Sequence, residues 1–178
     1  MQTRYSAEVD SQFGRLAVVW RVRRGRPVVL RIALPGSPYP PRMRSCPAVD
    51  ELCGSIRRML EGCAVEPATG LLDLGSCSRF QRRVLEAECR VPRGRVISYG
   101  GLAEAAGHTG AARAVGRALA ANPFPLVIPC HRTVRADGGL GGYRGGVDMK
   151  RTLLDMEGVR LSASGRIPRM LFVSCREI

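Results

Sequence analysis

The sequence has no long apolar run. No stretch of its 178 residues approaches the roughly 18 uninterrupted apolar residues of a membrane-spanning helix. The first residues, Met1 to Tyr5, also lack the apolar segment of a secretory signal. These absences predict a protein that stays in the cytoplasm and has no contact with a membrane, associated with the nucleoid if the source is a prokaryote.

Histidine is scarce and the cysteines are not paired. There are only two histidines, His108 and His131, and the seven cysteines include no Cys-x-x-Cys pair. The pattern is typical of neither a zinc ribbon nor a disulfide framework, so we expect reduced thiols and no metal site. No phosphate-binding GxxxxGK[ST] loop occurs, nor a strand-linked GxGxxG with an acidic partner, and we expect no cofactor.

Negative charge and lysine are also in short supply. The 28 Lys and Arg residues outnumber 15 Asp and Glu, which leaves a net charge of +13, and Lys150 is the only lysine. Such an excess is typical of proteins that bind polyanions, and guanidinium groups suit phosphates and base edges. A genomic preference for arginine over a solvated surface is the alternative explanation. The net charge favours nucleic acid as the partner.

The apolar content predicts a folded chain, and its strand-like and helical patterns predict the α+β class. Hydrophobic residues make up 45% of the sequence, and its length allows two small cores. Residues 5–34 alternate apolar and polar side chains around a turn at Gly25, which predicts antiparallel strands. A proline-rich break at 36–41 precedes helical apolar spacing that closes at Gly62. Residues 1–74 are therefore expected to form a small N-terminal α/β subdomain, a sheet with a helix.

The remaining chain, 75–178, reads as a mostly helical domain. A helix is predicted behind Ser78, and two short helices, 99–106 and 111–121, flank a turn with two glycines, the outline of a helix-turn-helix. Residues 123–129 form an apolar run that reads as extended. A last helix is expected to end at Gly158.

The helix predicted at 111–121 is slim and basic. Alanines and Gly116 let its backbone approach another surface closely, and Arg113 and Arg117 suit an edge that faces phosphate. A tightly packed core helix is the alternative interpretation. The pattern favours contact with nucleic acid.

Cys130 is the candidate nucleophile. A thiolate is the reactive form of cysteine, and His131 is adjacent in sequence, although most Cys-His dipeptides are structural or accidental. The glycine-rich segment 137–146 follows, with Tyr143 inside it as a possible stacking wall. A flexible surface linker is the alternative for that segment.

A series of motifs resembles the O6-alkylguanine-DNA alkyltransferase family. Ile128-Pro129-Cys130-His131-Arg132 follows Asn122-Pro123 and the segment 111–116 in family order. The similarity runs from about Phe80 to Gly158, whereas residues 1–74 resemble the family only in layout.

The resemblance implies a role for each of five catalytic residues. Cys130 would accept the alkyl group, with His131 acting through a bound water and Glu157 orienting that histidine. Asn122 would be the hinge between the helix-turn-helix and the active-site segment. Tyr99 would supply or steer the proton that the leaving guanine needs. Each molecule would react once and irreversibly, without a cofactor.

The resemblance also implies how double-stranded DNA is bound. The target nucleotide would be flipped out of the helix, with Arg113 filling the vacated space. Ala112 and Gly116 would keep the helix slim enough for the minor groove, and Arg117 would face phosphate. Tyr143 and the backbone of its glycine-rich loop would form the base pocket. Two further substrate-binding residues, Arg144 and Thr133, depart from the common family pattern and so bear on which alkyl groups fit. We expect a monomer, with O4-alkylthymine as a further candidate substrate.

Three other functions are alternatives to alkyl transfer. An alkyltransferase-like lesion sensor lacks the acceptor cysteine, which Cys130 supplies here. A transcription regulator would use the helix-turn-helix alone, and a Cys-His hydrolase or redox protein would turn over esters, peptides or disulfides. Neither accounts for the glycine-rich loop, the slim arginine helix and Asn122 together.

Overall fold

The computed structural model describes residues 3–178, and the chain divides into two compact units. The division separates Met1–Ser76 with Pro123–Val127 from Cys77–Asn122 with Ile128–Ile178. Met1 and Gln2, which belong to the stretch inspected for a signal segment, lie outside the described residues. From residue 3 onward, no helix has the length and apolar character needed to cross a membrane.

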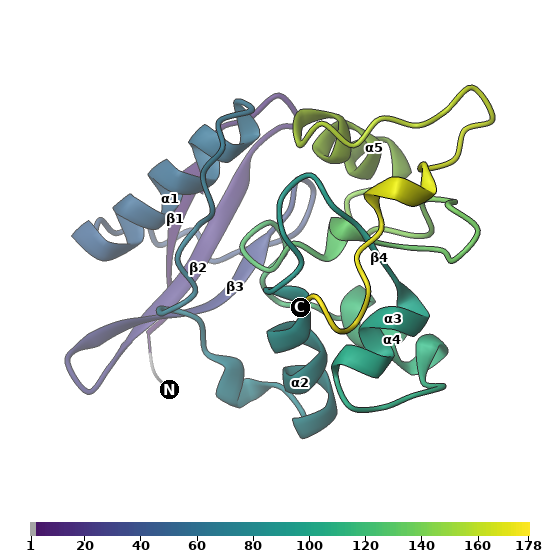
Figure 1. Ribbon diagram of the computed structural model, residues 1–178. Coiled ribbons are helices and arrows are strands. Elements are labelled where there is room, and N and C mark those ends of the chain that lie inside the picture. The colour runs from purple at the N-terminus through teal and green to yellow at the C-terminus, as the bar shows by residue number, and fades with distance from the viewer. Residues whose placement is uncertain (1–2) are drawn as a thin grey trace. The chain divides into compact units, whose positions relative to one another are not determined.

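The first unit is a three-stranded antiparallel sheet with one long helix. Strands β1 (Tyr5–Val9), β2 (Leu16–Arg23) and β3 (Arg26–Ala33) lie in sequence order, and α1 (Pro47–Leu60) packs along the sheet (Figure 1). Arg24 and Gly25 both have positive φ, as a two-residue hairpin turn requires. The antiparallel strands predicted from the apolar–polar alternation, and the turn predicted at Gly25, are therefore present in the structure.

Helix α1 shows why its sequence is helical. Pro47 occupies the first turn, where its missing N–H is harmless, and Asp50 lies at the positive end of the helix dipole. Arg57 and Arg58 lie in the last turn, at the negative end. Six residues of the helix are buried, which fixes the face it presents: Val49, Leu52, Cys53, Ile56, Met59 and Leu60.

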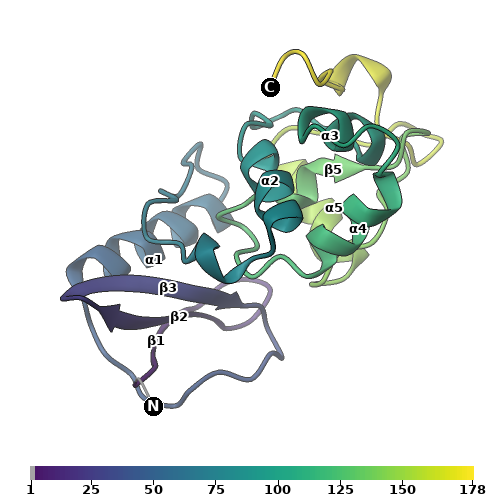
Figure 2. The same ribbon diagram turned by 90° about the horizontal axis from the view of Figure 1, so that it is seen from below.

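The second unit is mainly helical. Its elements are α2 (Arg79–Glu88), β4 (Ile97–Ser98), α3 (Tyr99–Ala105), α4 (Ala112–Ala120), η2 (Cys130–Arg132), β5 (Thr133–Val134), α5 (Val147–Met156) and η3 (Arg169–Leu171). The side chains of Ser78 and Ser98 cap α2 and α3 by accepting hydrogen bonds from Gln81 N and Gly101 N. Strands β4 and β5 pair in parallel, and Figure 2 shows β5 among the helices. The α+β class and the short helix pair α3–α4 are confirmed.

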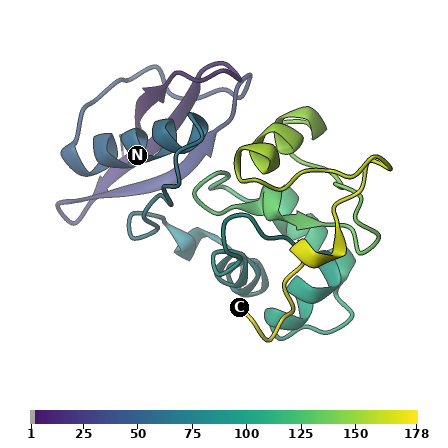
Figure 3. The same cartoon turned by 45° about the horizontal axis from the view of Figure 1, so that its top comes forward.

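The chain after α5 returns to β4. Val96 N donates to Leu171 O at 3.0 Å, and Val173 N donates to Val96 O at 2.8 Å, so the C-terminal segment lies beside β4 (Figure 3). The core beneath it comprises Val96, Val134, Leu140, Leu154, Val159 and Ile167. This core places η2 and β5, and with them Cys130, inside the second unit.

The expectation of an extended segment at 123–129 was wrong. Leu126 has a φ of 74°, so the backbone turns there. Asn122, which precedes the segment, donates from Nδ2 to the carbonyl oxygen of Ile128 at 3.2 Å, and this hydrogen bond closes a loop over the residues between them. An apolar run this short fits a buried turn as well as a strand.

Candidate active site

A pocket of about 340 Å³ in the second unit brings together side chains from four segments. Helix α3, helix α4, η2 and the glycine-rich loop contribute Tyr99, Gly116, Leu119, Ala120, Cys130, Gly142, Tyr143 and Arg144. Five residues that the sequence analysis proposed therefore line one cavity: Tyr99, Gly116, Cys130, Tyr143 and Arg144. Cys130 is only 8% exposed, so a reacting group must enter the pocket to reach its sulfur.

The Cys130 thiol is protonated at neutral pH in this environment. Burial raises its pKa to about 11, and a hydrogen bond from Asn122 opposes the shift. A thiol with this pKa is a weak nucleophile until a base removes its proton. The site therefore needs a base close to Cys130.

His131, the next residue, has the properties of that base. Burial lowers its pKa, so the imidazole is neutral, and its Nε2 lies 2.9 Å from Glu157 Oε1. An ionised carboxylate accepts hydrogen bonds only, so Nε2 must carry the proton in this pair. Among the described residues, the buried Nδ1 has no hydrogen-bond partner, which leaves it free to accept a proton.

Glu157 is held as a carboxylate by Arg132. Burial alone raises the pKa of Glu157, but the hydrogen bonds from His131 and Arg132 and the charge of Arg132 outweigh it and lower the pKa to about 2. Arg132 donates from Nε to Oε2 and from Nη2 to Oε1, both at 2.9 Å, and from Nη1 to Val91 O at 2.7 Å. A two-pronged arginine fixes the carboxylate in orientation as well as charge.

Sequence reasoning gave Arg132 no role, although it stands in the quoted motif. The guanidinium and the carboxylate are 25 residues apart in sequence. The position of Arg132 next to His131 was the one feature of the sequence that could have indicated this role.

Tyr99 is placed by two glycines. A Cβ on Gly141 would lie 2.9 Å from Tyr99 Oη, and a Cβ on Gly116 would lie 3.8 Å from the ring. Burial raises the pKa of Tyr99, so its hydroxyl keeps its proton and can donate it. Tyr143 also keeps its proton, because burial raises its pKa well above the usual value, and its ring stands edge-on to His131.

Arg144 and the arginines of α4 define the outer face. Arg144 donates from Nε and Nη2 to Ala120 O at 3.2 and 2.7 Å, which satisfies a carbonyl in the last turn of α4. Arg113 and Arg117 are exposed on α4, while Ala112 is partly buried. These exposed cations are available to a polyanion.

Thr133 does not line the pocket. It is buried on β5, and its hydroxyl donates to Glu88 Oε2 at 2.5 Å. Of the three residues Tyr143, Arg144 and Thr133, all expected to bind the substrate, the first two line the pocket and Thr133 does not.

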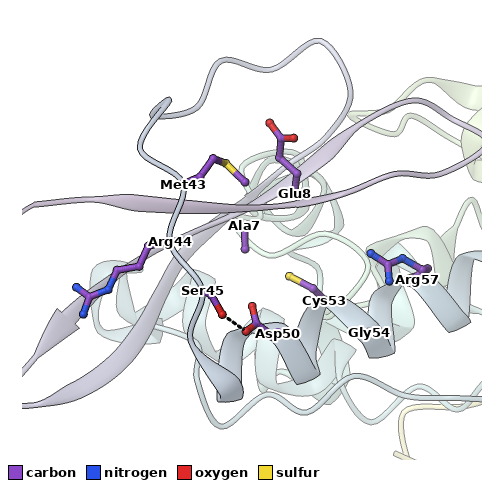
Figure 4. A pocket seen from close by; sticks show the side chains of 9 residues that line it. All are labelled: Ala7, Glu8, Met43, Arg44, Ser45, Asp50, Cys53, Gly54 and Arg57. Carbon is purple, nitrogen blue, oxygen red and sulfur yellow. Dashed lines mark hydrogen bonds between the residues drawn. The ribbon is translucent and has the colours of Figure 1, made fainter.

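The first unit carries a separate groove of about 440 Å³ between β1 and α1 (Figure 4). Charges of both signs line it, with Ser45 Oγ donating to Asp50 at 2.6 Å. Cys53 also borders it, but burial raises the pKa of this thiol to about 11 and no histidine lies among the lining residues. None of the proposed site residues lies in this groove.

Comparison with known proteins places the same region in one family. Residues 79–159 match the family described as "6-O-methylguanine DNA methyltransferase, DNA binding domain". A methylated-DNA–protein-cysteine methyltransferase of Methanothermobacter thermautotrophicus is 50% identical over 114 residues, 64% of each chain. Another, from Mycolicibacterium paratuberculosis, is 54% identical over 80 residues, 45% of this chain and 48% of its own. The match thus spans about half to two thirds of these relatives.

Solved structures extend the match to the first unit. O6-methylguanine methyltransferase of Mycobacterium tuberculosis is 31% identical with a TM-score of 0.69, covering 90% of this chain and 96% of that chain. OGT of the same bacterium in complex with DNA is 32% identical with a TM-score of 0.70, covering 86% and 93%. The resemblance carried by the cysteine motif is confirmed, and the chain belongs to the O6-methylguanine-DNA methyltransferase family.

Proposed function

We propose that this protein repairs DNA by direct reversal, transferring an alkyl group from O6 of guanine to its own Cys130. The observation that carries the proposal is the largely buried thiol of Cys130, which lines a pocket and is followed by the neutral, oriented base His131. The activity of the family's named members, methyl transfer from DNA to a protein cysteine, supports it.

The chemistry needs a thiolate, an alkyl carbon and a proton for the leaving base. His131 takes the thiol proton of Cys130 at Nδ1, through a bridging water, and Glu157 stabilises the imidazolium that results. The sulfur attacks the alkyl carbon, so an S–C bond forms as the C–O6 bond breaks. The electron pair of the broken C–O6 bond moves into the guanine ring, which takes its proton from Tyr99. The proton that His131 removed from Cys130 balances the charge and returns to Tyr99 through solvent.

The product explains why one molecule reacts once. A thioether is inert to the exchange that regenerates a thiol from a disulfide, so Cys130 stays alkylated. All the residues assigned to the reaction belong to one chain, and a monomer suffices.

Access to the pocket requires the base to leave the stack. The O6 position lies on the major-groove edge of a stacked guanine, and a cysteine that is 8% exposed cannot reach it there. A flipped base would enter between Tyr143 and α4, and Arg113 would occupy the gap in the stack. O4 of thymine carries its alkyl group on an equivalent exocyclic oxygen, so O4-alkylthymine is a second proposed substrate.

DNA is the proposed partner, and the charge of +13 supports it. We propose the cytoplasm as its location, in association with the nucleoid if the source is a prokaryote, where a duplex DNA substrate is found.

The test is restoration of guanine in DNA. A duplex whose restriction site is blocked by one O6-methylguanine should become cleavable after incubation with the protein, and should stay blocked with Cys130→Ser. Binding of the lesion without restored cleavage would mean a lesion sensor and would overturn the proposal.

A further inference from the structure

Glu88 is a buried carboxyl group that the proposed reaction does not use. It ends α2 and is 0% exposed. Its Oε2 accepts one hydrogen bond, from Thr133 Oγ1 at 2.5 Å, while its buried Oε1 has no hydrogen-bond partner among the described residues. A carboxylate with a single neutral donor is poorly compensated for the loss of water. Burial accordingly raises the pKa of Glu88 to about 7, against the hydrogen bond of Thr133 and the charges of Lys150 and Arg132.

Lys150 is the second buried charge of this region. It is 0% exposed on α5, and its Nζ donates to the backbone carbonyl of Thr133 at 2.6 Å. Burial lowers the pKa of Lys150 to about 8, while the charges of Cys130 and Glu88 raise it. Thr133 therefore joins an acid and a base, binding Glu88 with its hydroxyl and Lys150 with its carbonyl.

These two groups act on Cys130 in opposite directions. A negative charge on Glu88 raises the pKa of the Cys130 thiol, and the positive charge on Lys150 lowers it. The other ionisable groups that act on Glu88, or on which it acts, are Arg132 on η2 and Tyr99 on α3. Arg132 is bound to the carboxylate of Glu157, and Tyr99 is neutral. Lys150 is thus the buried cation whose effect on Cys130 a charged Glu88 can cancel.

We propose that Glu88 is a positioning residue whose protonation state controls the reactivity of Cys130 through Thr133 and Lys150. Neutral Glu88 leaves the Lys150 ammonium to stabilise the thiolate. Ionised Glu88 cancels that ammonium and adds a second negative charge near the sulfur. The inference rests on the proposed function for its meaning in repair, but it concerns the thiolate itself and can be tested without DNA.

The test follows alkylation of Cys130 by iodoacetamide as pH varies, with the modified peptide quantified by mass spectrometry. The wild type and Glu88→Gln should react equally at about pH 6, where Glu88 is already neutral. At about pH 7.5, where Glu88 is largely ionised and Lys150 is still largely protonated, Glu88→Gln should react about threefold faster, because it cannot acquire the negative charge. Equal rates at both pH values, or a variant slower at both, would overturn the proposal.

Two matched variants separate this effect from simple loss of charge or of structure. Glu86→Gln removes a carboxylate from the same helix, but an exposed one paired with Arg82, and should leave the pH profile unchanged. Glu88→Leu gives a second neutral side chain of similar volume, so the result does not depend on the folding of one variant. A structural role alone would change the melting temperature without a gain in rate that is confined to high pH.

Thr133→Val tests the link itself. It removes the one hydrogen bond that the Glu88 carboxylate accepts within residues 3–178. Glu88 should therefore stay neutral to a higher pH, and the rate should keep rising further into the alkaline range. An unchanged profile in Thr133→Val would show that the hydroxyl does not couple Glu88 to Cys130.

The same variants assayed with an O6-methylguanine duplex keep the two proposals apart. If neither the wild type nor any variant restores guanine, the proposed repair function is wrong. The pH dependence of the iodoacetamide reaction still decides the role of Glu88. If repair occurs but neither reaction depends on Glu88, the inference fails alone.

Discussion

Nε2 of His131 and Oε1 of Glu157 lie 2.9 Å apart, and both side chains are almost fully buried. The same carboxylate receives two hydrogen bonds from Arg132, so its position does not depend on the histidine. A fixed carboxylate holds one imidazole tautomer and leaves Nδ1 as the basic nitrogen. The imidazole next to the acceptor cysteine is thereby oriented before any substrate arrives.

Glu157→Gln should slow alkyl transfer strongly. The amide cannot stabilise the imidazolium as a carboxylate does, and it leaves Arg132 without its counter-charge. We expect a rate about 100-fold lower in single-turnover assays, the scale of a lost general-base contribution. Asp155→Asn, which removes an exposed carboxylate from the last turn of α5, two residues before Glu157, is the control and should react at the wild-type rate. A normal rate in Glu157→Gln would remove the base role from His131.

The same carboxylate should make folding sensitive to acid. The pKa of Glu157 is about 2 in the folded protein and near 4.5 when unfolded, so it stabilises the fold above about pH 4.5. That stability should be lost as the pH falls from about 4.5 toward 2. The melting temperature of the wild type should therefore fall more steeply over this pH range than the melting temperature of Glu157→Gln. Parallel curves would show that Glu157 titrates normally.

Gly141→Ala should displace Tyr99. The new methyl group would lie 2.9 Å from Tyr99 Oη, and the backbone has a φ of +70° there. Gly165→Ala is the matched control, because its φ of +72° imposes similar strain with no atom within 4 Å. Each variant should lose about 1 kcal/mol of stability from the positive φ. Only Gly141→Ala should also lose about tenfold in transfer rate, the low end of what a positioned proton donor contributes. Equal rates would mean that Tyr99 does not need its present position.

Two arginines on α4 should separate base flipping from phosphate binding. Arg113→Ala should slow transfer even at saturating duplex, because nothing fills the space that the base vacates. Arg117→Ala should weaken binding and lower the slope of log affinity against log salt by about one, with a near-normal rate at saturation. Fluorescence anisotropy over a salt series and single-turnover kinetics measure the two effects. Salt-independent binding by the wild type would contradict phosphate contact altogether.

Much of the fold follows from local patterns in the sequence. The alternation around Gly25 gave the hairpin of β2 and β3, and the capping serines Ser78 and Ser98 mark the starts of α2 and α3. These signals are local, since a cap or a tight turn depends on a few neighbouring residues. The turn at Leu126 was missed because a short apolar run fits a strand and a buried turn equally well.

From the residues alone, the site was predictable only where neighbours in sequence are neighbours in space, whereas the pairing of His131 with Glu157, 26 residues away, was implied by the family resemblance. Cys130 and His131 are adjacent, whereas Arg132 meets Glu157 25 residues away and Thr133 meets Glu88 45 residues away. Pairing over such distances depends on how α2 and α5 pack against β5, which no local pattern specifies. Thr133 was accordingly expected among the substrate-binding residues, but it does not line the pocket and instead binds Glu88.

The central claim is that Cys130 becomes the alkyl acceptor. Intact-protein mass should be measured after incubation with excess duplex containing one O6-methylguanine, with Cys130→Ser in parallel. The account predicts a gain of one methyl group per wild-type molecule, mapped to the Cys130 peptide and no greater with more DNA, and no gain in Cys130→Ser. A wild-type protein that binds the lesion but keeps its original mass would contradict the account.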